Sequence, residues 1–241
     1  MIVDVVVLQH IACEPPGEYE AVLRERGARL HRVELDEGDR LPALTDFDAI
    51  VAMGGPMSVN DDAGLPWLAG EKRAIGQAVR AGVPYFGACL GVQLLAAGLG
   101  ARVYAGSQPE VGVLPVALTP EGAADPIFAG LPGSFPALQW HGDTFDLPEG
   151  ATLLASSPAF PHQAFRYGRA AYGIQFHMEV LPEMAREWAT VPEYAAYADR
   201  VLGEGGMERL MSEFDGAEEG MRAAGRAMFE RWAELAVPVA G

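Results

Sequence analysis

The chain has 241 residues and half of them are hydrophobic, which is enough to bury the core of one large domain or of one domain with an appendage. Its formal net charge is −16, and this acidity argues against a nucleic-acid ligand because neutralising phosphates needs lysine and arginine. Lys72 is the only lysine, so the sequence offers neither a Walker-type lysine for ATP nor a suitable lysine for Schiff-base chemistry.

The sequence contains no pattern typical of a metal site, an export signal or a membrane span. The two cysteines, Cys13 and Cys89, are too few for a disulfide framework, and no metal-ligand spacing includes them. The first residues lack a basic segment followed by a long apolar one, and no apolar run reaches membrane-spanning length. We therefore expect a cytoplasmic protein that has no metal or cofactor and no nucleic-acid or membrane partner.

The first hundred residues alternate between expected strands and expected helices. Strands are indicated at Ile2–Leu8, Arg29–Leu35, Asp48–Met53 and Val83–Phe86. Helices are indicated at Glu18–Gly27, at Trp67–Ala81 and from Leu90 onward. This alternation predicts an α/β fold with a mostly parallel sheet flanked by helices, and it places ligand chemistry at the carboxyl ends of the strands.

From Arg102 the pattern changes to short strands separated by proline and glycine turns. They are expected at Val103–Ala105, Val113–Leu118, Thr152–Ala155, Ala164–Tyr167 and Ala171–Phe176. We interpret them as a small antiparallel annex that returns the chain to the main sheet through its last strand.

The residues after His177 have a helical pattern. Helices are expected at Pro182–Trp188, Glu193–Leu202 and Ala217–Leu235, with a break at residues 203–206. Apolar residues recur on one face of the last segments, at Met207, Leu210, Met211, Phe214, Met221, Met228, Phe229 and Trp232. We interpret this face as core packing rather than as a groove for a partner. The chain is therefore divided into residues 1–185 and a C-terminal helical extension, residues 186–241, packed on them.

A nucleophile pattern lies between the Val83–Phe86 strand and the helix that follows it. Gly87-Ala-Cys89-Leu-Gly91 has the form G-x-nucleophile-x-G, in which a sharp strand-to-helix turn exposes its strained middle residue at the edge of the sheet. The positive end of the helix favours a thiolate. The alternative is a glycine turn around a small buried cysteine, because at this glycine content the pattern arises by chance about once in seventy cysteines. The flanking strand and helix favour the nucleophile.

A histidine and a glutamate follow the last expected strand, in the segment Gly173-Ile-Gln-Phe-His177-Met-Glu179. Residues two apart on an extended segment point the same way, so Glu179 is placed to accept a hydrogen bond from the imidazole. A carboxylate in this role fixes the tautomer of His177 and stabilises the imidazolium when it takes a proton from a thiol. The alternative is a strand-end histidine followed by a glutamate that begins a helix. A nearby cysteine elbow favours catalysis.

A Gly-Gly loop, a G-x-C-x-G turn and a Q-F-H-x-E segment, in this order, resemble the class I (triad) glutamine amidotransferases, most closely their free-standing single-domain members. The resemblance covers roughly residues 1–185 and implies a flavodoxin-like fold. It also implies a catalytic triad that hydrolyses the side-chain amide of glutamine through a γ-glutamyl thioester. In that triad Cys89 would be the nucleophile, His177 the base and Glu179 the orienting acid. The N–H groups of Gly55 and Leu90 would form the oxyanion hole.

The same resemblance implies where the substrate binds. The implied substrate-binding residues are Gly54, Gln93, Trp140, His141, Gly142 and Asp143. Gln93 would line the glutamine pocket, and residues 140–143 would present backbone to the amino-acid end of the substrate. The chain departs from many relatives at Val92, where they have histidine, and at Met178, where they have proline. Neither position supplies a catalytic group, so these departures suggest a subfamily away from the guanylate and anthranilate branches.

Three functions stay open. The first is a glutaminase that passes ammonia to an acceptor site on a synthase partner, and the second is a stand-alone γ-glutamyl hydrolase or peptidase. Either enzyme would bind glutamine or another γ-glutamyl compound. The third is a non-enzymatic reactive-cysteine protein for stress sensing or chaperoning, which the His-x-Glu segment disfavours. His10 and Cys13, after the first strand, are expected to have a loop role rather than a part in the site.

Overall fold

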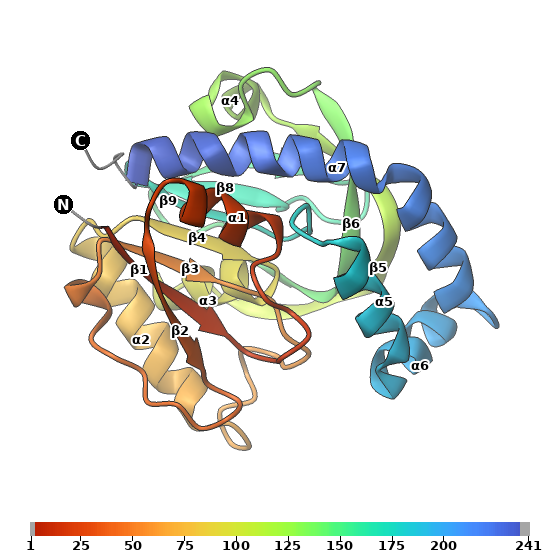
Figure 1. Cartoon of the computed structure of the whole chain (residues 1–241), viewed down its shortest axis with the longest axis horizontal. Helices are drawn as coiled ribbons and strands as arrows, with labels where there is room; N and C mark the ends of the chain where they lie inside the picture. The colour runs from red at the N-terminus through yellow and green to blue at the C-terminus, as the bar shows by residue number, and fades with distance from the viewer. Residues whose placement is uncertain (1–2, 237–241) are drawn as a thin grey trace.

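The computed structural model describes residues 3–236, and within them a nine-stranded sheet carries helices on both faces (Figure 1). The strands are β1 Asp4–Gln9, β2 Arg29–Glu34, β3 Ala49–Ala52, β4 Tyr85–Ala88, β5 Val103–Leu118, β6 Ser134–Phe145, β7 Ala151–Ser156, β8 Ala164–Tyr167 and β9 Ala171–Ile174. The α-helices are α1 Glu18–Glu25, α2 Trp67–Arg80, α3 Leu90–Gly98, α4 Pro120–Ala124, α5 Pro182–Thr190, α6 Pro192–Leu202 and α7 Gly206–Ala236.

The sheet has a parallel part and an antiparallel part, in the strand order β2-β1-β3-β4-β9-β8-β7-β5-β6. Neighbouring strands from β2 to β9 run parallel, and each pair from β9 to β6 runs antiparallel. This confirms the predicted α/β class, a parallel sheet extended by an antiparallel annex and followed by C-terminal helices. Strand β9 joins the two parts, so the segment leading to His177 lies beside the strand leading to Cys89.

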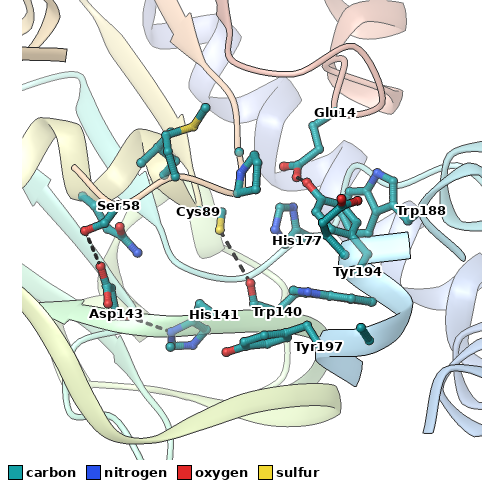
Figure 2. Close-up of a pocket in the computed structure, with 18 of the residues that line it drawn as sticks. Glu14, Ser58, Cys89, Trp140, His141, Asp143, His177, Trp188, Tyr194 and Tyr197 are labelled. Carbon is teal, nitrogen blue, oxygen red and sulfur yellow. Dashed lines mark hydrogen bonds between the residues drawn. The ribbon is translucent and has the colours of Figure 1, made fainter. Parts of the chain in front are cut away.

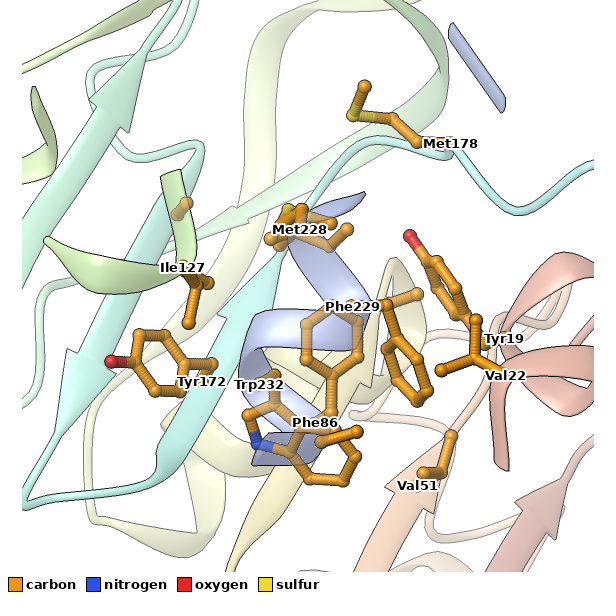
Figure 3. Packing of buried hydrophobic residues seen from close by; sticks show 14 of the residues in the cluster. Tyr19, Val22, Val51, Phe86, Ile127, Tyr172, Met178, Met228, Phe229 and Trp232 are labelled. Atoms are coloured by element: carbon orange, nitrogen blue, oxygen red, sulfur yellow. The ribbon is translucent and has the colours of Figure 1, made fainter. Parts of the chain in front are cut away.

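Two cores cover the two faces of the parallel strands. Alternate residues of β1 point to opposite faces, so Val5 and Val7 belong to one core while Val6 and Leu8 belong to the other. Helices α1 and α7 cover the first face, and α2 and α3 cover the second (Figure 1). The centre of the first core is aromatic: Figure 3 shows Tyr19, Phe86, Phe229 and Trp232 packed together, with the rings of Tyr19 and Phe229 stacked at 4.3 Å.

Helix α7 is longer than the sequence analysis expected, because it begins at Gly206 rather than at Ala217. Its three interior glycines, Gly216, Gly220 and Gly225, each reduce helical stability by about 1 kcal/mol relative to alanine. Packing compensates for this cost, since the apolar face from Met207 to Trp232 is buried apart from the half-buried Met211. The interpretation of this face as core packing is confirmed, and the division of the chain at residue 185 stays a prediction.

Two predictions for the antiparallel part were wrong. No strand was predicted between residues 118 and 152, where β6 forms, and two short strands were predicted where β5 is continuous, with an irregularity between Ala105 and Glu110. Prolines explain both errors, Pro136 in β6 and Pro109 in the irregular part of β5, because a residue without an N–H argues against a strand. Here Pro136 pairs opposite Pro115 within the ladder. Of the expected first strand, Ile2 lies outside the described residues.

Candidate active site

Cys89 occupies the turn between β4 and α3, with φ of 52° and ψ of −107°. Among residues 3–236 it is the only non-glycine residue with a positive φ. Such a conformation costs about 1–3 kcal/mol and persists only where the surrounding structure imposes it. The strained elbow expected from the sequence is therefore confirmed.

The two glycines of the elbow allow α3 to start directly against the sheet. A Cβ atom on Gly87 would lie 2.5 Å from the carbonyl carbon of Gly91. A Cβ atom on Gly91 would lie 2.2 Å from the backbone oxygen of Ala52 in β3. Any side chain at either position would push the helix away from the strands, and the cysteine would move with it.

Strand pairing brings His177 to the same edge of the sheet as Cys89. The N–H of Cys89 donates to the backbone oxygen of Ile174, at the end of β9, at 2.9 Å. On the other side His177 exchanges two backbone hydrogen bonds with Leu138 of β6, at 2.8 and 3.2 Å. As a result the side chains of Cys89 and His177 lie side by side although 88 positions separate them (Figure 2).

Glu179 holds one ring nitrogen of His177. The Nδ1 atom of His177 lies 2.6 Å from Glu179 Oε1, and the backbone N–H of Met178 donates to Glu179 Oε2 at 2.9 Å. The imidazole and the carboxylate are both almost completely buried. Because Nδ1 carries the hydrogen that faces Glu179, Nε2 is left to exchange a proton with a neighbouring thiol.

The charges around His177 favour its imidazolium form. Burial opposes that form, but the negative charge of Glu179 and that of a Cys89 thiolate outweigh it and raise the pKa of His177 well above 6.5. An imidazolium beside a thiolate is the arrangement that activates cysteine nucleophiles. The site therefore has the charge pattern that such chemistry needs.

A cavity of about 580 Å³ opens beside Cys89, within the range of volumes that bind small molecules. The residues singled out from the sequence that line it are Gly55, Cys89, Leu90, Gln93, Trp140, His141, Gly142, Asp143 and His177. Gly54 and Glu179 are not part of its lining. The fold thus gathers loops from distant parts of the chain around one cavity.

Gly55 and Leu90 lie where the oxyanion donors are expected. Leu90 is the first residue of α3, so its N–H has no partner within the helix. A Cβ atom on Gly55 would lie 2.7 Å from Met57 Sδ and 2.9 Å from His10 Cβ, so this loop has room only for glycine. Their role as donors stays a prediction.

The two remaining candidates near the sulfur have different surroundings. Gly54 lies behind the cavity, where a Cβ atom would be 2.0 Å from Glu14 Oε2 and 3.2 Å from His177 Cε1. Gln93 is buried in the cavity wall and donates from Nε2 to Gln175 Oε1 at 3.1 Å. Gln175 in turn donates from Nε2 to Cys89 Sγ at 3.7 Å. Gln175, which the sequence analysis did not select, therefore links Gln93 to the sulfur.

Strand β6 forms the opposite wall of the cavity (Figure 2). The backbone oxygen of Trp140 lies 3.9 Å from Cys89 Sγ. Both ring nitrogens of His141 are engaged, one with the backbone oxygen of Asp143 at 2.9 Å and the other with Glu110 Oε2 at 3.2 Å. The carboxylate of Asp143 accepts a hydrogen bond from Ser58 Oγ at 2.8 Å and so ties the loop after β3 to β6. These side chains brace the wall, and their substrate contacts stay predictions.

The segment after residue 185 supplies a wall of the cavity that was not predicted, formed by Trp188, Glu193, Tyr194, Ala196, Tyr197 and Arg200. Four further lining residues that were not predicted belong to the loops after β1 and β3: Glu14, Pro56, Met57 and Ser58. The hydroxyl of Tyr194 donates to Glu14 Oε1 at 2.6 Å, and burial raises the pKa of Glu14. The edge of Trp188 packs against His177 with the ring centroids 5.3 Å apart. The three-residue spacing of Tyr194 and Tyr197 on α6 was the only local signal of this wall.

Neither a metal site nor a membrane span is found in the described part of the chain. Residues 3–236 contain no group of three His, Cys, Asp or Glu side chains arranged to hold a metal ion. None of the helices in that range is long and apolar enough to cross a membrane. The expected cytoplasmic location stays a prediction.

Comparison with known proteins agrees with the resemblance noted in the sequence. A sequence profile described as "Glutamine amidotransferase class-I" matches residues 19–188. The glutamine amidotransferase-like protein YfeJ of Salmonella typhimurium is 34% identical over 178 residues, which cover 72% of this chain and 74% of that protein. The glutamine-hydrolysing GMP synthase of Streptomyces avermitilis is 36% identical over 135 residues, covering 55% of this chain but only 24% of the synthase.

Two solved structures match nearly the whole chain. A glutamine amidotransferase from Thermotoga maritima superimposes with a TM-score of 0.84 at 31% identity, covering 97% of this chain and 99% of the other. A glutamine amidotransferase from Methylobacillus flagellatus gives a TM-score of 0.87 at 26% identity, with coverage of 100% and 98%. The C-terminal helices therefore fall within the matched fold, although the sequence profile ends at residue 188.

Proposed function

Because the chain belongs to the class I glutamine amidotransferase family, we propose that it hydrolyses the side-chain amide of glutamine and releases ammonia for transfer to an acceptor. One observation carries the proposal: a cysteine in a strained elbow lies beside a buried histidine–glutamate pair at the edge of a cavity. Geometry of this kind activates a thiol for attack on an acyl carbon.

In the proposed reaction the thiolate of Cys89 attacks the γ-carbonyl carbon of glutamine. The oxyanion that forms accepts hydrogen bonds from the N–H groups of Gly55 and Leu90, each typically worth about 3 kcal/mol in the transition state. The imidazolium of His177 then gives its Nε2 proton to the leaving ammonia, and a γ-glutamyl thioester remains on the sulfur. His177 next takes a proton from water, which attacks the thioester and releases glutamate. Glu179 keeps Nδ1 protonated throughout.

We propose that a partner chain holds the ammonia acceptor. The match covers only 24% of the Streptomyces GMP synthase, so the whole activity of that enzyme does not transfer to this chain. One subunit of the glutamine-hydrolysing GMP synthase of Sulfurisphaera tokodaii is 36% identical over 139 residues, and the match covers 70% of that subunit. Because that enzyme is divided into subunits, we propose that this chain likewise works as a glutaminase beside a separate synthase chain. In this proposal residues 1–185 form the glutaminase unit and residues 186–241 the extension that completes its cavity.

A stand-alone γ-glutamyl hydrolase is the second candidate function, and the cavity favours it. A cavity of about 580 Å³ suits drug-sized ligands, which are much larger than glutamine. Its far wall, formed by Tyr194, Tyr197 and Arg200 of α6, belongs to this chain rather than to a partner. The attack on the γ-carbonyl is the same in both candidates, and only the leaving group differs.

Release of ammonia from glutamine, compared with release of amines from a panel of γ-glutamyl amides, decides between the two candidates. Turnover of glutamine that increases when a synthase is added supports the amidotransferase. Fast turnover of another γ-glutamyl compound by the protein alone supports the hydrolase. If nothing is turned over while Cys89 oxidises readily, both enzymatic proposals fail and a reactive-cysteine sensor takes their place.

A further inference from the structure

Another buried histidine–glutamate pair lies behind the loop that carries Gly55. His10 follows β1, Glu71 lies in α2, and both side chains are completely buried. The Nε2 atom of His10 is 2.9 Å from Glu71 Oε1, and its Nδ1 atom is 3.2 Å from the backbone oxygen of Gly54. The ring of Trp67 stacks on the imidazole, at 5.9 Å between centroids and 20° between planes. An ionisable pair buried this deeply needs a structural or functional reason.

Both nitrogens of His10 face oxygen atoms. A backbone carbonyl only accepts, so Nδ1 must carry a hydrogen for its contact with Gly54 to be a hydrogen bond. Burial lowers the pKa of His10, but Glu71, the Gly54 carbonyl and Glu14 together raise it above 6.5. The second oxygen of Glu71 has no hydrogen-bond partner within residues 3–236, which leaves His10 as the group that compensates this carboxylate.

The bond to Gly54 also decides where the next N–H points. The carbonyl of Gly54 and the N–H of Gly55 belong to one planar trans peptide, so they point in opposite directions. His10 lies behind this peptide, whereas Gly55 lines the cavity with Cys89. Holding the carbonyl toward His10 therefore turns the N–H of Gly55 away from His10, toward the cavity.

The glycine backbone by itself does not impose this orientation. Two consecutive glycines rotate with little steric resistance, and a rotated peptide would present the carbonyl oxygen to the cavity instead of the N–H. An oxygen there would repel an oxyanion, whereas a fixed N–H stabilises it without any cost of reorganisation during the reaction.

We propose that His10, held by Glu71, is a positioning residue that fixes the Gly54–Gly55 peptide so that the Gly55 N–H faces the oxyanion. This inference rests on the proposed function, because an oxyanion forms only if the thiolate attacks an amide. It adds a role for two side chains that touch neither the cavity nor the sulfur.

Two variants of His10 separate its two hydrogen bonds. In His10→Asn the side-chain amide nitrogen takes the place of Nδ1 and still donates to the Gly54 oxygen. In His10→Gln the longer side chain puts its amide in the place of Nε2, where it still contacts Glu71, and no donor faces the Gly54 oxygen. His31→Gln is the matched control, because it is the same substitution at another histidine–carboxylate contact, that of His31 Nε2 with Asp4 at 2.6 Å, on an edge strand outside the cavity lining.

The rates to measure are hydrolysis of glutamine and of γ-glutamyl-p-nitroanilide, and alkylation of Cys89 by iodoacetamide. Alkylation attacks a saturated carbon and forms no oxyanion, so it reports the thiolate alone. For His10→Gln we expect kcat to fall about 100-fold, the usual effect of losing one oxyanion donor, with KM and alkylation nearly unchanged. For His10→Asn and His31→Gln we expect rates within about threefold of wild type. Equal losses in the two His10 variants, or alkylation falling in parallel with kcat, would overturn the proposal.

Crystal structures of the same variants test the inference without relying on activity. The Gly54 carbonyl should keep its direction in His10→Asn and turn toward the cavity, or become disordered, in His10→Gln; an unchanged carbonyl in His10→Gln overturns the positioning role. Should His10→Gln fail to fold, His10→Ala takes its place as the variant without a donor to Gly54 and should lose the same 100-fold in kcat, whereas such a loss in His10→Asn contradicts the role. If the wild type hydrolyses neither substrate, the proposed function fails, and the carbonyl direction still decides the positioning.

Discussion

Of the buried histidine–glutamate pairs around the site, His177–Glu179 and His10–Glu71 differ in what the second ring nitrogen of the histidine faces. In His177–Glu179 the partners are two residues apart and the free nitrogen is beside the Cys89 sulfur. In His10–Glu71 the partners are 61 residues apart and the other nitrogen faces a backbone oxygen. The pKa of both histidines is raised above 6.5. The same chemical pair therefore suits proton transfer in one place and backbone support in the other, and its neighbours decide which.

Replacing the sulfur should give the largest effect on activity, with both pairs left in place. We expect Cys89→Ala to abolish γ-glutamyl turnover while the melting temperature stays nearly unchanged, because alanine keeps the positive φ and fills nearly the same space. Cys89→Gly should be equally inactive but more stable than Cys89→Ala by about 1 kcal/mol, since glycine tolerates this conformation. Turnover assays and urea unfolding check both. A large stability loss with turnover preserved would show that Cys89 is a core residue.

Replacing the glutamate of each pair by glutamine should give the largest difference in kcat between the two pairs. Both oxygens of Glu179 are engaged, so in Glu179→Gln the amide oxygen stays with the Met178 N–H and the amide nitrogen faces His177 Nδ1. That nitrogen forces the wrong tautomer, and we expect kcat to fall by about 10⁴.

Glu71→Gln is the matched control. Glu71 Oε2 has no hydrogen-bond partner among residues 3–236, so the amide in Glu71→Gln is free to turn either its oxygen or its nitrogen toward His10 Nε2. His10 can therefore keep its hydrogen on Nδ1 and its hydrogen bond to the Gly54 oxygen. We expect a loss in kcat of less than about tenfold. Equal losses in the two glutamine variants, measured by steady-state kinetics, would mean that the pairs do not differ in role.

Gly55→Ala should lower kcat less than Glu179→Gln does, because it disturbs only the Gly54–Gly55 peptide that His10 and Glu71 support. The Cβ atom of Gly55→Ala would lie 2.7 Å from Met57 Sδ and 2.9 Å from His10 Cβ, so the loop must shift. We expect kcat to fall about 100-fold while iodoacetamide alkylates Cys89 at the wild-type rate. Wild-type turnover in this variant would remove Gly55 from the oxyanion hole.

The smallest effect concerns Glu14, whose charge interacts with both histidines. Burial raises the pKa of Glu14 above 4.5, so the folded state favours its neutral form. The stability contributed by this neutral form is complete below pH 4.5 and is lost as the pH rises through the raised pKa. Glu14→Gln keeps an acceptor for Tyr194 and should be more stable than wild type at pH 8, by about 1.4 kcal/mol per unit of pKa difference. Urea unfolding at pH 4.5 and pH 8 measures the difference in unfolding free energy between Glu14→Gln and wild type. A variant that is no more stable than wild type at pH 8 contradicts the prediction.

The first pair was predictable from the sequence, and the second was not. Cys89 lies in a short local pattern, and His177 and Glu179 are only two residues apart, so the local sequence was enough to predict that the three act together. His10 and Glu71 meet only because the loop after β1 packs against α2, and no local spacing indicates such a contact. His10 was therefore assigned a loop role, which is true of its place in the chain but misses its contacts with Gly54 and Glu71.

The same reasoning explains the limits of the fold prediction. The parallel strands and their helices were recognisable because apolar runs and helical spacing mark them directly. Strand β6 was missed because Pro136 and the polar residues around His141 conceal its pairing with β5. The α6 wall was missed because Tyr194 becomes part of the cavity only through Glu14, 180 residues earlier in the chain.

Mass spectrometry of the protein, acid-quenched during turnover of a γ-glutamyl amide, tests the central claim most directly. The account predicts one γ-glutamyl group in thioester linkage on the peptide that contains Cys89, absent from Cys89→Ala. Ammonia or amine released at the same rate by Cys89→Ala, or an acyl group found on any other residue, would contradict it.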